Sequence, residues 1–249
     1  MIDPYAATAE FYDLVAVPLW ERKGSVLAAA LRQARPDLGP ILDIGAGTGL
    51  STEAVADAVP DAKVIAVEPS AAMRIALATR IAVRGLTDRV TIVADPVGAL
   101  AFPDRLGGAV VYGVLGHLPA ADRTRLLTTL GERLAPGAPA VVELLDETAP
   151  PTPAPTRIAR VPVGEHHIEV WSRGSEYEPD QQQGGSVRWT LTYRLLHRNT
   201  VLRTVESPMP WADYDLAALR AEAWRAGLRC MRVAPDTALL THGDSAEFE

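Results

Sequence analysis

The sequence predicts an α/β fold, a Rossmann-like doubly wound seven-stranded sheet with a small antiparallel β insertion after the fifth strand. Short apolar runs alternate with helix-compatible segments between residues 37 and 148. A glycine-rich turn follows the first of these runs, and strict period-two alternation begins only near residue 187. With 249 residues, of which 48% are hydrophobic, the chain can bury a full core in one enzyme-sized unit.

The first strand, expected at 41–44, leads into a loop with glycine at alternate positions, Gly45, Gly47 and Gly49. Glycine allows a sharp turn and a close approach of the backbone to a ligand. The N-terminal amides of the helix expected at 50–59 face the same place. The pattern therefore predicts a ligand site at the end of the first strand.

The spacing of the loop restricts the ligand. A dinucleotide fingerprint needs its third glycine three positions after the second, where this chain has Leu50. The loop also has no lysine to meet a phosphate group. We therefore expect a nucleoside-like ligand that carries an amino acid end in place of a pyrophosphate.

Three expected strands each end in a carboxylate. Asp43 lies at the end of the first strand, Glu68 follows the strand expected at 63–67, and Asp95 follows the strand expected at 90–94. Parallel strands present their carboxyl ends at one edge of the sheet, and open α/β folds bind ligands there. An acid after the second strand suits ribose hydroxyls, which donate hydrogen bonds to it.

With these motifs in order, the chain resembles the class I S-adenosylmethionine-dependent methyltransferases. The resemblance covers roughly residues 5–147 and 212–241. Several ordered motifs at compatible spacing are more specific than any single one. The matching segments are LDIGAGTG, VEPSAAM, Asp95, GAVVYGVLGHL and LAPGAPAVVEL.

The resemblance implies that S-adenosylmethionine is the cofactor and S-adenosylhomocysteine the product. It implies that Asp43 and the loop amides hold the methionine part, that Glu68 holds the ribose, and that Asp95 with Met73 holds the adenine. The full set expected to contact the cofactor is Tyr12, Asp43, Gly45, Ala46, Gly47, Glu68, Pro69, Met73, Asp95, Pro96, Val97 and Tyr112.

Two positions leave alternatives open. Pro96 has no N–H, so if related enzymes donate an amide to adenine from this position, the contact here shifts to Val97 or is lost. Tyr12 resembles the N-terminal tyrosine with which related enzymes close over the cofactor, and helix packing is the equal alternative. Tyr5 is a weaker copy of the same feature.

The other elements complete the core. Residues 5–34 are expected to form two helices, broken near Pro18, over the cofactor end of the sheet. The remaining elements are expected as helices at 70–83, 120–134 and 213–226, and as strands at 108–112, 139–144, 228–234 and 237–241.

The alternation of short apolar strands with helices stops after the fifth strand. A proline-rich stretch at 149–155 reads as a linker. Period-two alternation at 187–195, with further strands at 201–205 and 167–172, predicts an antiparallel sheet of three or more strands. The expected division is a helical cap at 1–36, a cofactor-binding core at 37–148 and 211–243, and an inserted lid for the substrate or a dimer at 149–210.

Catalytic candidates are less specific than the cofactor motif. His117, just after the fourth strand, is either a general base or a structural histidine. His167 in the insertion could be a base carried by the lid, with a solvent-facing strand residue as the alternative. Glu143, at the end of the fifth strand, either faces the acceptor or pairs with an arginine.

The aromatic side chains of the insertion have two interpretations. Tyr193, Trp171 and Trp189 could wall an acceptor pocket or shield a cationic sulfonium, or they could form the apolar face of a sheet. Trp211 and Trp224 flank or belong to the late helix and are expected in the core.

Composition narrows the partners. The net charge is −7, which argues against sustained binding to a nucleic acid backbone. Cys230 is the only cysteine, and the histidines lack zinc-ligand spacing, so we expect no disulfide and no metal. Neither a signal peptide nor a membrane segment is evident, which predicts a cytoplasmic protein.

The expected function is methyl transfer from S-adenosylmethionine to N, O or C of a small organic acceptor, in secondary metabolism. The alternatives are a cofactor-bound rearrangement or cyclisation without methyl transfer, and a nucleoside-binding or NAD-dependent protein, which Leu50 disfavours. A homodimer is open, because an inserted sheet with a free edge is a pairing surface.

Overall fold

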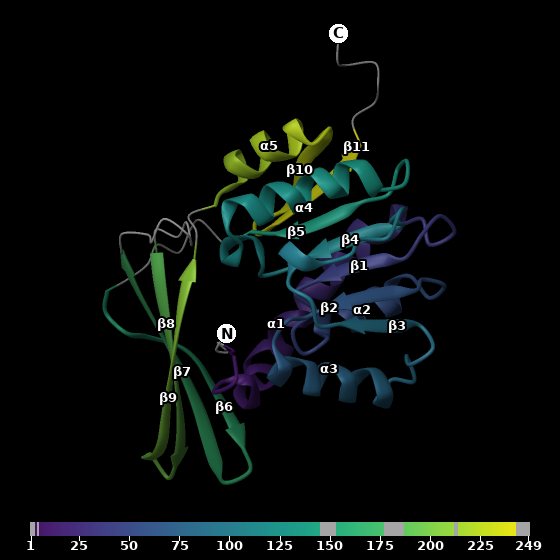
Figure 1. The fold of residues 1–249 in the computed structure, drawn as a ribbon. Coiled ribbons are helices and arrows are strands. Elements are labelled where there is room, and N and C mark those ends of the chain that lie inside the picture. The colour runs from purple at the N-terminus through teal and green to yellow at the C-terminus, as the bar shows by residue number, and fades with distance from the viewer. Residues whose placement is uncertain (1–2, 4, 145–152, 177–186, 212–213, 243–249) are drawn as a thin grey trace.

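A computed structural model of the chain describes residues 3, 5–144, 153–176, 187–211 and 214–242. Two sheets, a larger one flanked by helices and a smaller one standing beside it, form the molecule (Figure 1). No helix among the described residues combines the length and apolar character that a membrane crossing needs.

The larger sheet has seven strands in the order β3-β2-β1-β4-β5-β11-β10. The first five are parallel, β11 is antiparallel to β5, and β10 is antiparallel to β11. This confirms the predicted Rossmann-like sheet. Its strands are β1 (Ile41–Ile44), β2 (Val64–Val67), β3 (Val90–Val93), β4 (Gly108–Val111), β5 (Ala140–Glu143), β10 (Leu228–Ala234) and β11 (Thr237–His242).

Helices cover both faces of this sheet. On one face, α1 (Ala9–Ala30), α2 (Leu50–Ala58) and α3 (Ala71–Val83) bury side chains such as Leu27, Val55 and Leu77. On the other face, α4 (Ala120–Arg133) and α5 (Leu216–Arg225) bury leucines such as Leu127 and Leu219. The β1 sequence alternates between the two cores, because successive strand side chains point to opposite faces. Short 3₁₀ turns occupy Leu31–Gln33, Val97–Ala99 and Leu115–His117.

The N-terminal segment corrects one prediction. Residues 9–30 form one helix that contains Pro18, not two helices broken there. Pro18 is exposed, so water can satisfy the carbonyl that the proline leaves without an amide donor. Buried contacts at both ends of α1, from Phe11 and Leu27, hold the helix as one unit.

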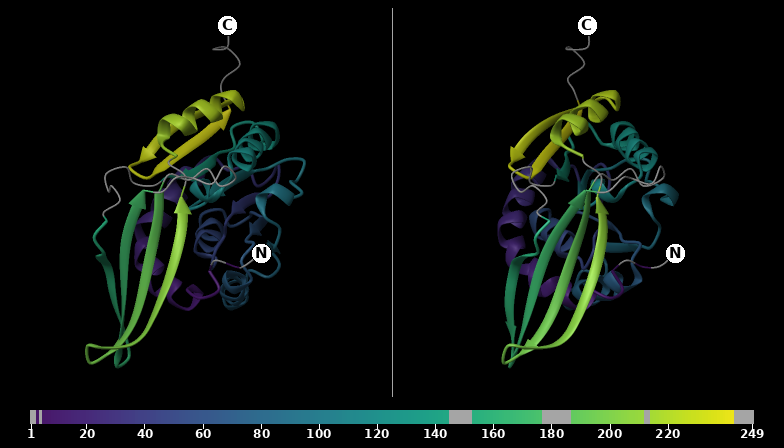
Figure 2. Two further views of the ribbon diagram at one scale, coloured as in Figure 1. Left: turned by 60° about the vertical axis from the view of Figure 1, so that its left-hand side comes forward. Right: turned by 90° about the vertical axis from the view of Figure 1, so that its left-hand side faces the viewer.

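The smaller sheet, here called the lid sheet, is antiparallel with strand order β6-β7-β8-β9. Its long hairpins project past the core as an arm (Figure 2). Sequence alternation located three of the four strands but not β6. The bounds are β6 (Thr156–Val163), β7 (His166–Glu176), β8 (Val187–His197) and β9 (Thr200–Trp211).

Other expectations differ in detail or fall outside the described residues. Trp224 on α5 is 57% exposed, so the prediction that it lies in the core was wrong. Strand β9 continues to Trp211, one residue into the segment assigned to the core. Most of the proline-rich stretch at 149–155 and the tail from Gly243 lie outside the described residues.

Candidate active site

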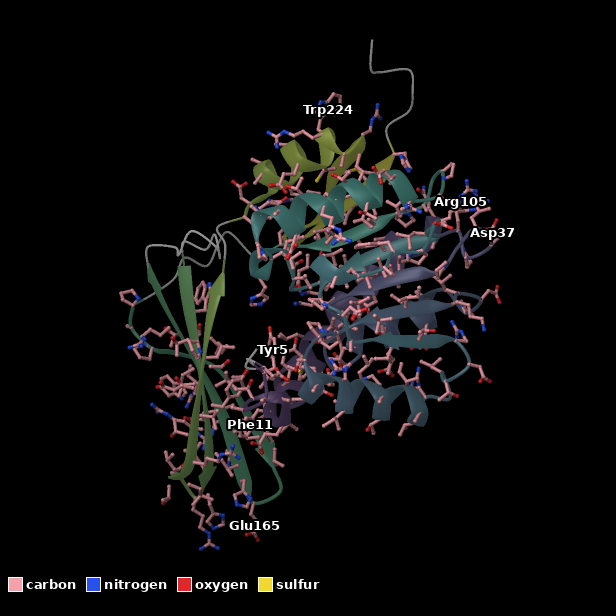
Figure 3. The ribbon with its side chains drawn as sticks, viewed as in Figure 1. Tyr5, Phe11, Asp37, Arg105, Glu165 and Trp224 are labelled. Carbon is pink, nitrogen blue, oxygen red and sulfur yellow. The ribbon has the colours of Figure 1, made fainter. Side chains whose placement is uncertain are left out.

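The carboxyl edge of the parallel sheet gathers the three predicted acids. Asp43 lies within β1, Glu68 directly follows β2, and Asp95 lies two residues after β3. Because β1, β2 and β3 are adjacent and parallel, these acids share one edge. The lid sheet and the start of α1 stand beside the same region, with Tyr5 and Phe11 between lid and core (Figure 3).

The glycine loop between β1 and α2, residues 45–49, has the close-packed form that the spacing predicts. Gly45, Gly47 and Gly49 have φ of 69°, 57° and 92°, which favour glycine. A Cβ added to Gly45 would lie 2.2 Å from Cγ2 of Val114. A side chain at this position would therefore have to displace the segment after β4.

The loop amides are already engaged within the protein. The N–H groups of Gly45 and Ala46 both donate to the carbonyl of Val67, at 2.8 and 3.0 Å. The N–H of Gly47 donates to Oε2 of Glu68 at 2.8 Å. That these amides hold the methionine part stays a prediction, and the hydrogen bonds that they make within the protein go to the neighbouring strand and its acid.

Asp43 is fully buried and only partly satisfied. Its Oδ2 accepts hydrogen bonds from the hydroxyls of Ser51 and Thr52, at 2.8 and 2.5 Å. Its Oδ1 has no partner among the described residues. Burial raises the pKa of Asp43 to about 6, against the two hydroxyl bonds that lower it. A buried carboxylate oxygen without a donor suits a cationic ligand group such as an amino acid ammonium.

Glu68 joins the glycine loop to the start of α3. Its Oε1 accepts from the N–H of Ser70 at 2.7 Å, while Oε2 holds Gly47. Burial raises the pKa of Glu68, and the two amide hydrogen bonds oppose the shift. Each oxygen has a second lone pair for a hydroxyl donor, which fits the expected ribose.

The expected adenine side lies along the ends of β2 and β3. Met73 is buried in the first turn of α3, where its N–H donates to the capping hydroxyl of Ser70. Pro69, Asp95 and Pro96 are exposed at this edge, and Val97 is buried in a 3₁₀ turn. This mixture of an apolar floor and an acidic rim is compatible with a planar base.

Tyr112, just after β4, is buried beneath α1 and near the ring of Trp20, with 5.6 Å between the ring centroids. Its hydroxyl has no hydrogen-bond partner among the described residues. Burial raises the pKa of Tyr112 to about 12, against a smaller opposing effect of Thr237, so the phenol remains protonated.

A second group of side chains lies where the lid sheet meets the core: Tyr5, Tyr12 and His117 come from the core side, and Tyr193 comes from β8 of the lid sheet. The Tyr5 hydroxyl lies 3.3 Å from Nε2 of His117, in the turn after β4. Burial raises the pKa of Tyr5 to about 12, with further contributions from Glu68 and Tyr193. Burial, followed by Tyr5, also raises the pKa of Tyr12. The group therefore presents protonated phenols and an imidazole; sequence reasoning missed the link between Tyr5 and His117.

Glu143, at the end of β5, pairs with a lysine where the sequence suggested an arginine. Lys23 of α1 forms a close ion pair with its Oε1, and burial raises the pKa of Glu143 against this pairing. Arg22 contacts Asp236 at 3.3 Å in the same way. The two pairs hold the middle of α1 to the sheet.

The structure does not bring every candidate together. His167 lies three residues from Gly164 in the β6–β7 turn, at the end of the lid sheet where Glu165 is seen far from the core (Figure 3). Trp171 alternates with Val170, which faces α1, so it lies on the outer face. There its Nε1 donates to Glu169 at 3.1 Å, with Arg194 over the ring at 5.1 Å. Trp189 lies on the same face of the lid sheet as Tyr193, which is the face that meets α1.

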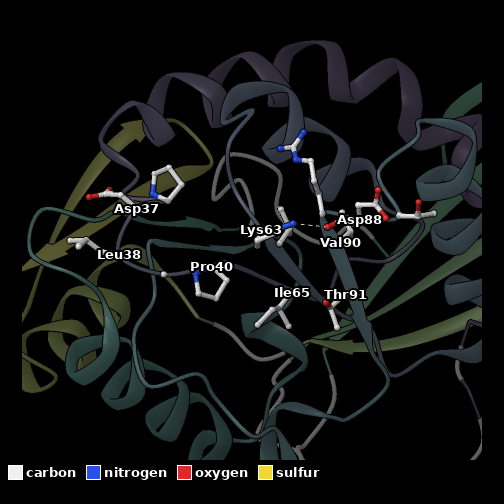
Figure 4. A pocket seen from close by; sticks show the side chains of 13 residues that line it. Asp37, Leu38, Pro40, Lys63, Ile65, Asp88, Val90 and Thr91 are labelled. Atoms are coloured by element: carbon white, nitrogen blue, oxygen red, sulfur yellow. Dashed lines mark hydrogen bonds between the residues drawn. The ribbon is translucent and has the colours of Figure 1, made fainter.

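A separate hollow of 720 Å³ opens at the opposite edge of the sheet, where the strands begin (Figure 4). Its lining includes Pro40, Asp88 and Val90, and Lys63 spans part of it with a hydrogen bond to the Asp88 carbonyl at 2.7 Å. Because none of the acids at the carboxyl edge reaches this hollow, it is not the predicted ligand site.

Comparison with known proteins agrees with this geometry. Residues 41–137 match a family described as "Methyltransferase domain". DesVI of Streptomyces venezuelae is 18% identical with a TM-score of 0.74, over 94% of this chain and 98% of that one. No curated protein sequence matches.

Two further solved structures share the fold. The sugar N-methyltransferase KedS8 of a Streptoalloteichus species is 16% identical with a TM-score of 0.70, over 94% of this chain and 93% of that one. CalS10, an amino pentose methyltransferase of Micromonospora echinaspora, is 18% identical with a TM-score of 0.69, over 90% and 92%. At these identities the likeness establishes the fold, lid sheet included.

Proposed function

Since residues 41–137 match a family described as "Methyltransferase domain", we propose that the chain is an S-adenosylmethionine-dependent enzyme that methylates an amino group of a hydroxyl-rich small molecule, such as an amino sugar of a natural product. In this proposal, residues 37–148 and 211–243 hold the cofactor, while residues 1–36 and 149–210 shape the acceptor site. The Tyr5–His117 pair beside the glycine loop is the observation that carries the choice of an amine.

The cofactor roles follow the buried polar groups. Asp43, through its unpartnered Oδ1, binds the methionine ammonium. Glu68 accepts hydrogen bonds from the ribose, and the loop contributes close backbone approach at Gly45, Ala46 and Gly47 rather than free amides. Tyr12 and Tyr112 close the site from α1 and β4. The adenine side is formed by Pro69, Met73, Asp95, Pro96 and Val97.

The acceptor side is rich in neutral hydrogen-bonding groups. The phenols of Tyr5, Tyr12 and Tyr193 can each donate and accept a hydrogen bond, which suits the hydroxyls of a sugar. Their ring faces also attract a cation such as an ammonium or a sulfonium. A neutral amine already has a nucleophilic lone pair, whereas a hydroxyl depends on a general base that removes its proton during the attack.

S-adenosylmethionine supplies a methyl group already activated by its sulfonium. What the chain must add is alignment, exclusion of water and the removal of one proton. An ammonium has no lone pair, so His117 takes its proton at Nε2, directly or through the Tyr5 hydroxyl, before or as nitrogen attacks. The neutral amine would then have a lone pair for the methyl group that the bound cofactor would supply, S-adenosylhomocysteine would be the leaving group, and His117 would pass its proton to solvent. His167 has no part in this step, because it lies at the far end of the lid sheet.

Similar folds support this acceptor class by analogy only. KedS8 is described as a sugar N-methyltransferase, CalS10 as an amino pentose methyltransferase, and MtfA, 22% identical with a TM-score of 0.53, as a glycopeptide N-methyltransferase.

The test is incubation with S-adenosylmethionine and paired acceptors, each amino sugar beside the same sugar with a hydroxyl in place of the amine. We expect a methyl gain by mass spectrometry for amino members only. A gain confined to hydroxyl members would overturn the amine assignment. No gain in either set, with S-adenosylhomocysteine binding intact, would favour a rearrangement or cyclisation.

Matched variants test the roles of the pair. Tyr5→Phe removes one hydroxyl, and His117→Gln removes the titratable ring. We expect His117→Gln to lower kcat about 100-fold with little change in cofactor affinity. Tyr5→Phe should lower kcat less. Unchanged kcat in His117→Gln would assign His117 a structural role.

A further inference from the structure

Asp13, one residue after Tyr12 on α1, contacts the glycine loop directly. Its Oδ1 accepts a hydrogen bond from the Thr48 hydroxyl at 2.5 Å, and Thr48 is only 2% exposed. Its Oδ2 accepts from Nη2 of Arg80 on α3, also at 2.5 Å. Both oxygens of one carboxylate are thus committed to elements that surround the expected cofactor.

Arg80 completes the connection. Its Nε donates to the main-chain carbonyl of Thr48 at 3.0 Å, and its Nη1 donates to Glu53 of α2 at 2.8 Å. A Cβ on Gly49 would lie 3.3 Å from Cδ of Arg80, so the absent side chain leaves room for the arginine stem over the loop. The planar guanidinium therefore joins α1, α2 and the glycine loop at once.

The same turn of α1 also reaches the lid sheet. Phe11, two residues before Asp13, stacks on Tyr193 of β8 with 5.4 Å between ring centroids. Tyr12 lies between these two contacts. A shift of this turn would therefore change the glycine loop, the closing tyrosine and the lid together.

We propose that Asp13 and Arg80 are positioning residues that latch α1 to the glycine loop, so that cofactor affinity depends on the docked position of α1. Neither residue needs to touch the cofactor. The inference rests on the assignment of the glycine loop to the cofactor and is independent of the acceptor.

The arrangement differs from an ordinary surface ion pair. Arg84, the residue directly after α3, contacts Asp57 and Glu53 at 2.8 Å each, with 44% of its side chain exposed. That pairing links α3 to α2 alone and is of the kind that contributes little. Arg80 is 19% exposed, and it also binds the loop and α1. Arg84→Ala is therefore a matched control for the loss of an arginine.

The first experiment measures S-adenosylhomocysteine binding by calorimetry in the wild type, Asp13→Asn, Arg80→Lys and Arg84→Ala. We expect the Kd to rise about fivefold or more in Asp13→Asn and Arg80→Lys, and to stay within about twofold in Arg84→Ala. The proposal would be overturned if the Kd of all three variants stayed within about twofold of the wild-type value, or if all three lost affinity equally. If the wild type itself does not bind, the cofactor assignment fails instead.

Two further measurements separate positioning from loss of folding. The KM for S-adenosylmethionine should rise in Asp13→Asn while kcat at saturating cofactor is retained, and thermal unfolding should match Arg84→Ala. Should Asp13→Asn fold poorly, Thr48→Val removes only the hydroxyl partner. In the double variant Asp13→Ala with Thr48→Val, compared with its two single variants, the effects on Kd should be far from additive, because each substitution removes the hydrogen bond between these two side chains. Additive effects would overturn the proposal.

Discussion

The ring of Phe11 on α1 stacks on the ring of Tyr193 on β8, with 5.4 Å between centroids and 16° between the ring planes. Both side chains are buried, at 4% and 6% exposed, in a small apolar cluster with Ile168 and Val170. This cluster is separate from the two cores of the larger sheet. The stacked pair is therefore part of the apolar cluster that attaches the lid sheet to α1.

Replacing Phe11 should loosen the lid. Phe11→Ala removes a buried aromatic ring, which costs about 3 kcal/mol where the site cannot collapse, and it should raise the acceptor KM because the lid no longer holds its wall. Phe11→Leu keeps apolar bulk and should lose about 1 kcal/mol of aromatic pairing. Chemical denaturation and acceptor kinetics measure both effects. Equal kinetics in the wild type and Phe11→Ala would show that the lid is held by other contacts.

The sequence was sufficient for the parts of the fold that repeat a local rule. Glycines at alternate positions and strands that end in Asp43 and Glu68 have few alternative structures, so the carboxyl edge and its elements were predictable. The continuity of α1 through Pro18 was not, because it depends on buried contacts at both helix ends. Tertiary packing overrode the local breaker there.

In the candidate site, too, local patterns were predictable from the sequence, and contacts that depend on tertiary packing were not. Period two identified the alternation around Tyr193, but alternation alone does not say which face meets the core, and Trp171 lies on the other one. Arg80 and Asp13 are separated by 67 residues, and no local pattern relates them. Long-range polar contacts of this kind follow from how helices dock, not from spacing.

Gly45 should be far less tolerant of alanine than Gly85. Both have positive φ, 69° and 64°, so each alanine variant bears about 1–2 kcal/mol of backbone strain. A Cβ at Gly85 meets open space, whereas one at Gly45 lies 2.2 Å from Val114. We expect Gly85→Ala to retain cofactor binding and Gly45→Ala to lose it about tenfold or more. Similar binding in the two variants would contradict a close-packed loop.

Cofactor affinity should depend on pH through Asp43. Its pKa is raised to about 6 from an ordinary 3.8, chiefly by burial. Compared with the unfolded chain, the folded protein therefore favours the protonated form of Asp43. Protonation of Asp43 therefore contributes to the unfolding free energy in full below the ordinary pKa, and this contribution is lost as the pH rises through 6. A bound ammonium needs the ionised form, so affinity should fall as pH drops.

Calorimetry with S-adenosylhomocysteine checks this dependence. Between pH 7.5 and pH 5 the wild type should lose about tenfold in affinity, as a pKa of about 6 requires. Asp43→Asn should bind weakly and equally at both pH values, and its stability should lack the wild-type change through pH 6. A wild-type affinity that is flat over this range would remove Asp43 from the ammonium site.

Trp171 should matter for stability and not for activity, unlike Trp189. Trp171 sits on the outer face of the lid sheet, and its indole N–H donates to the buried carboxylate of Glu169. Trp171→Phe leaves that carboxylate one donor short, which should lower the unfolding free energy by about 1 kcal/mol while kcat/KM stays unchanged. Trp189→Phe, on the face of Tyr193, should instead raise the acceptor KM. Because the two substitutions are chemically identical and the residues differ in the face they occupy, a reversed result would mean that the acceptor meets the outer face of the lid sheet.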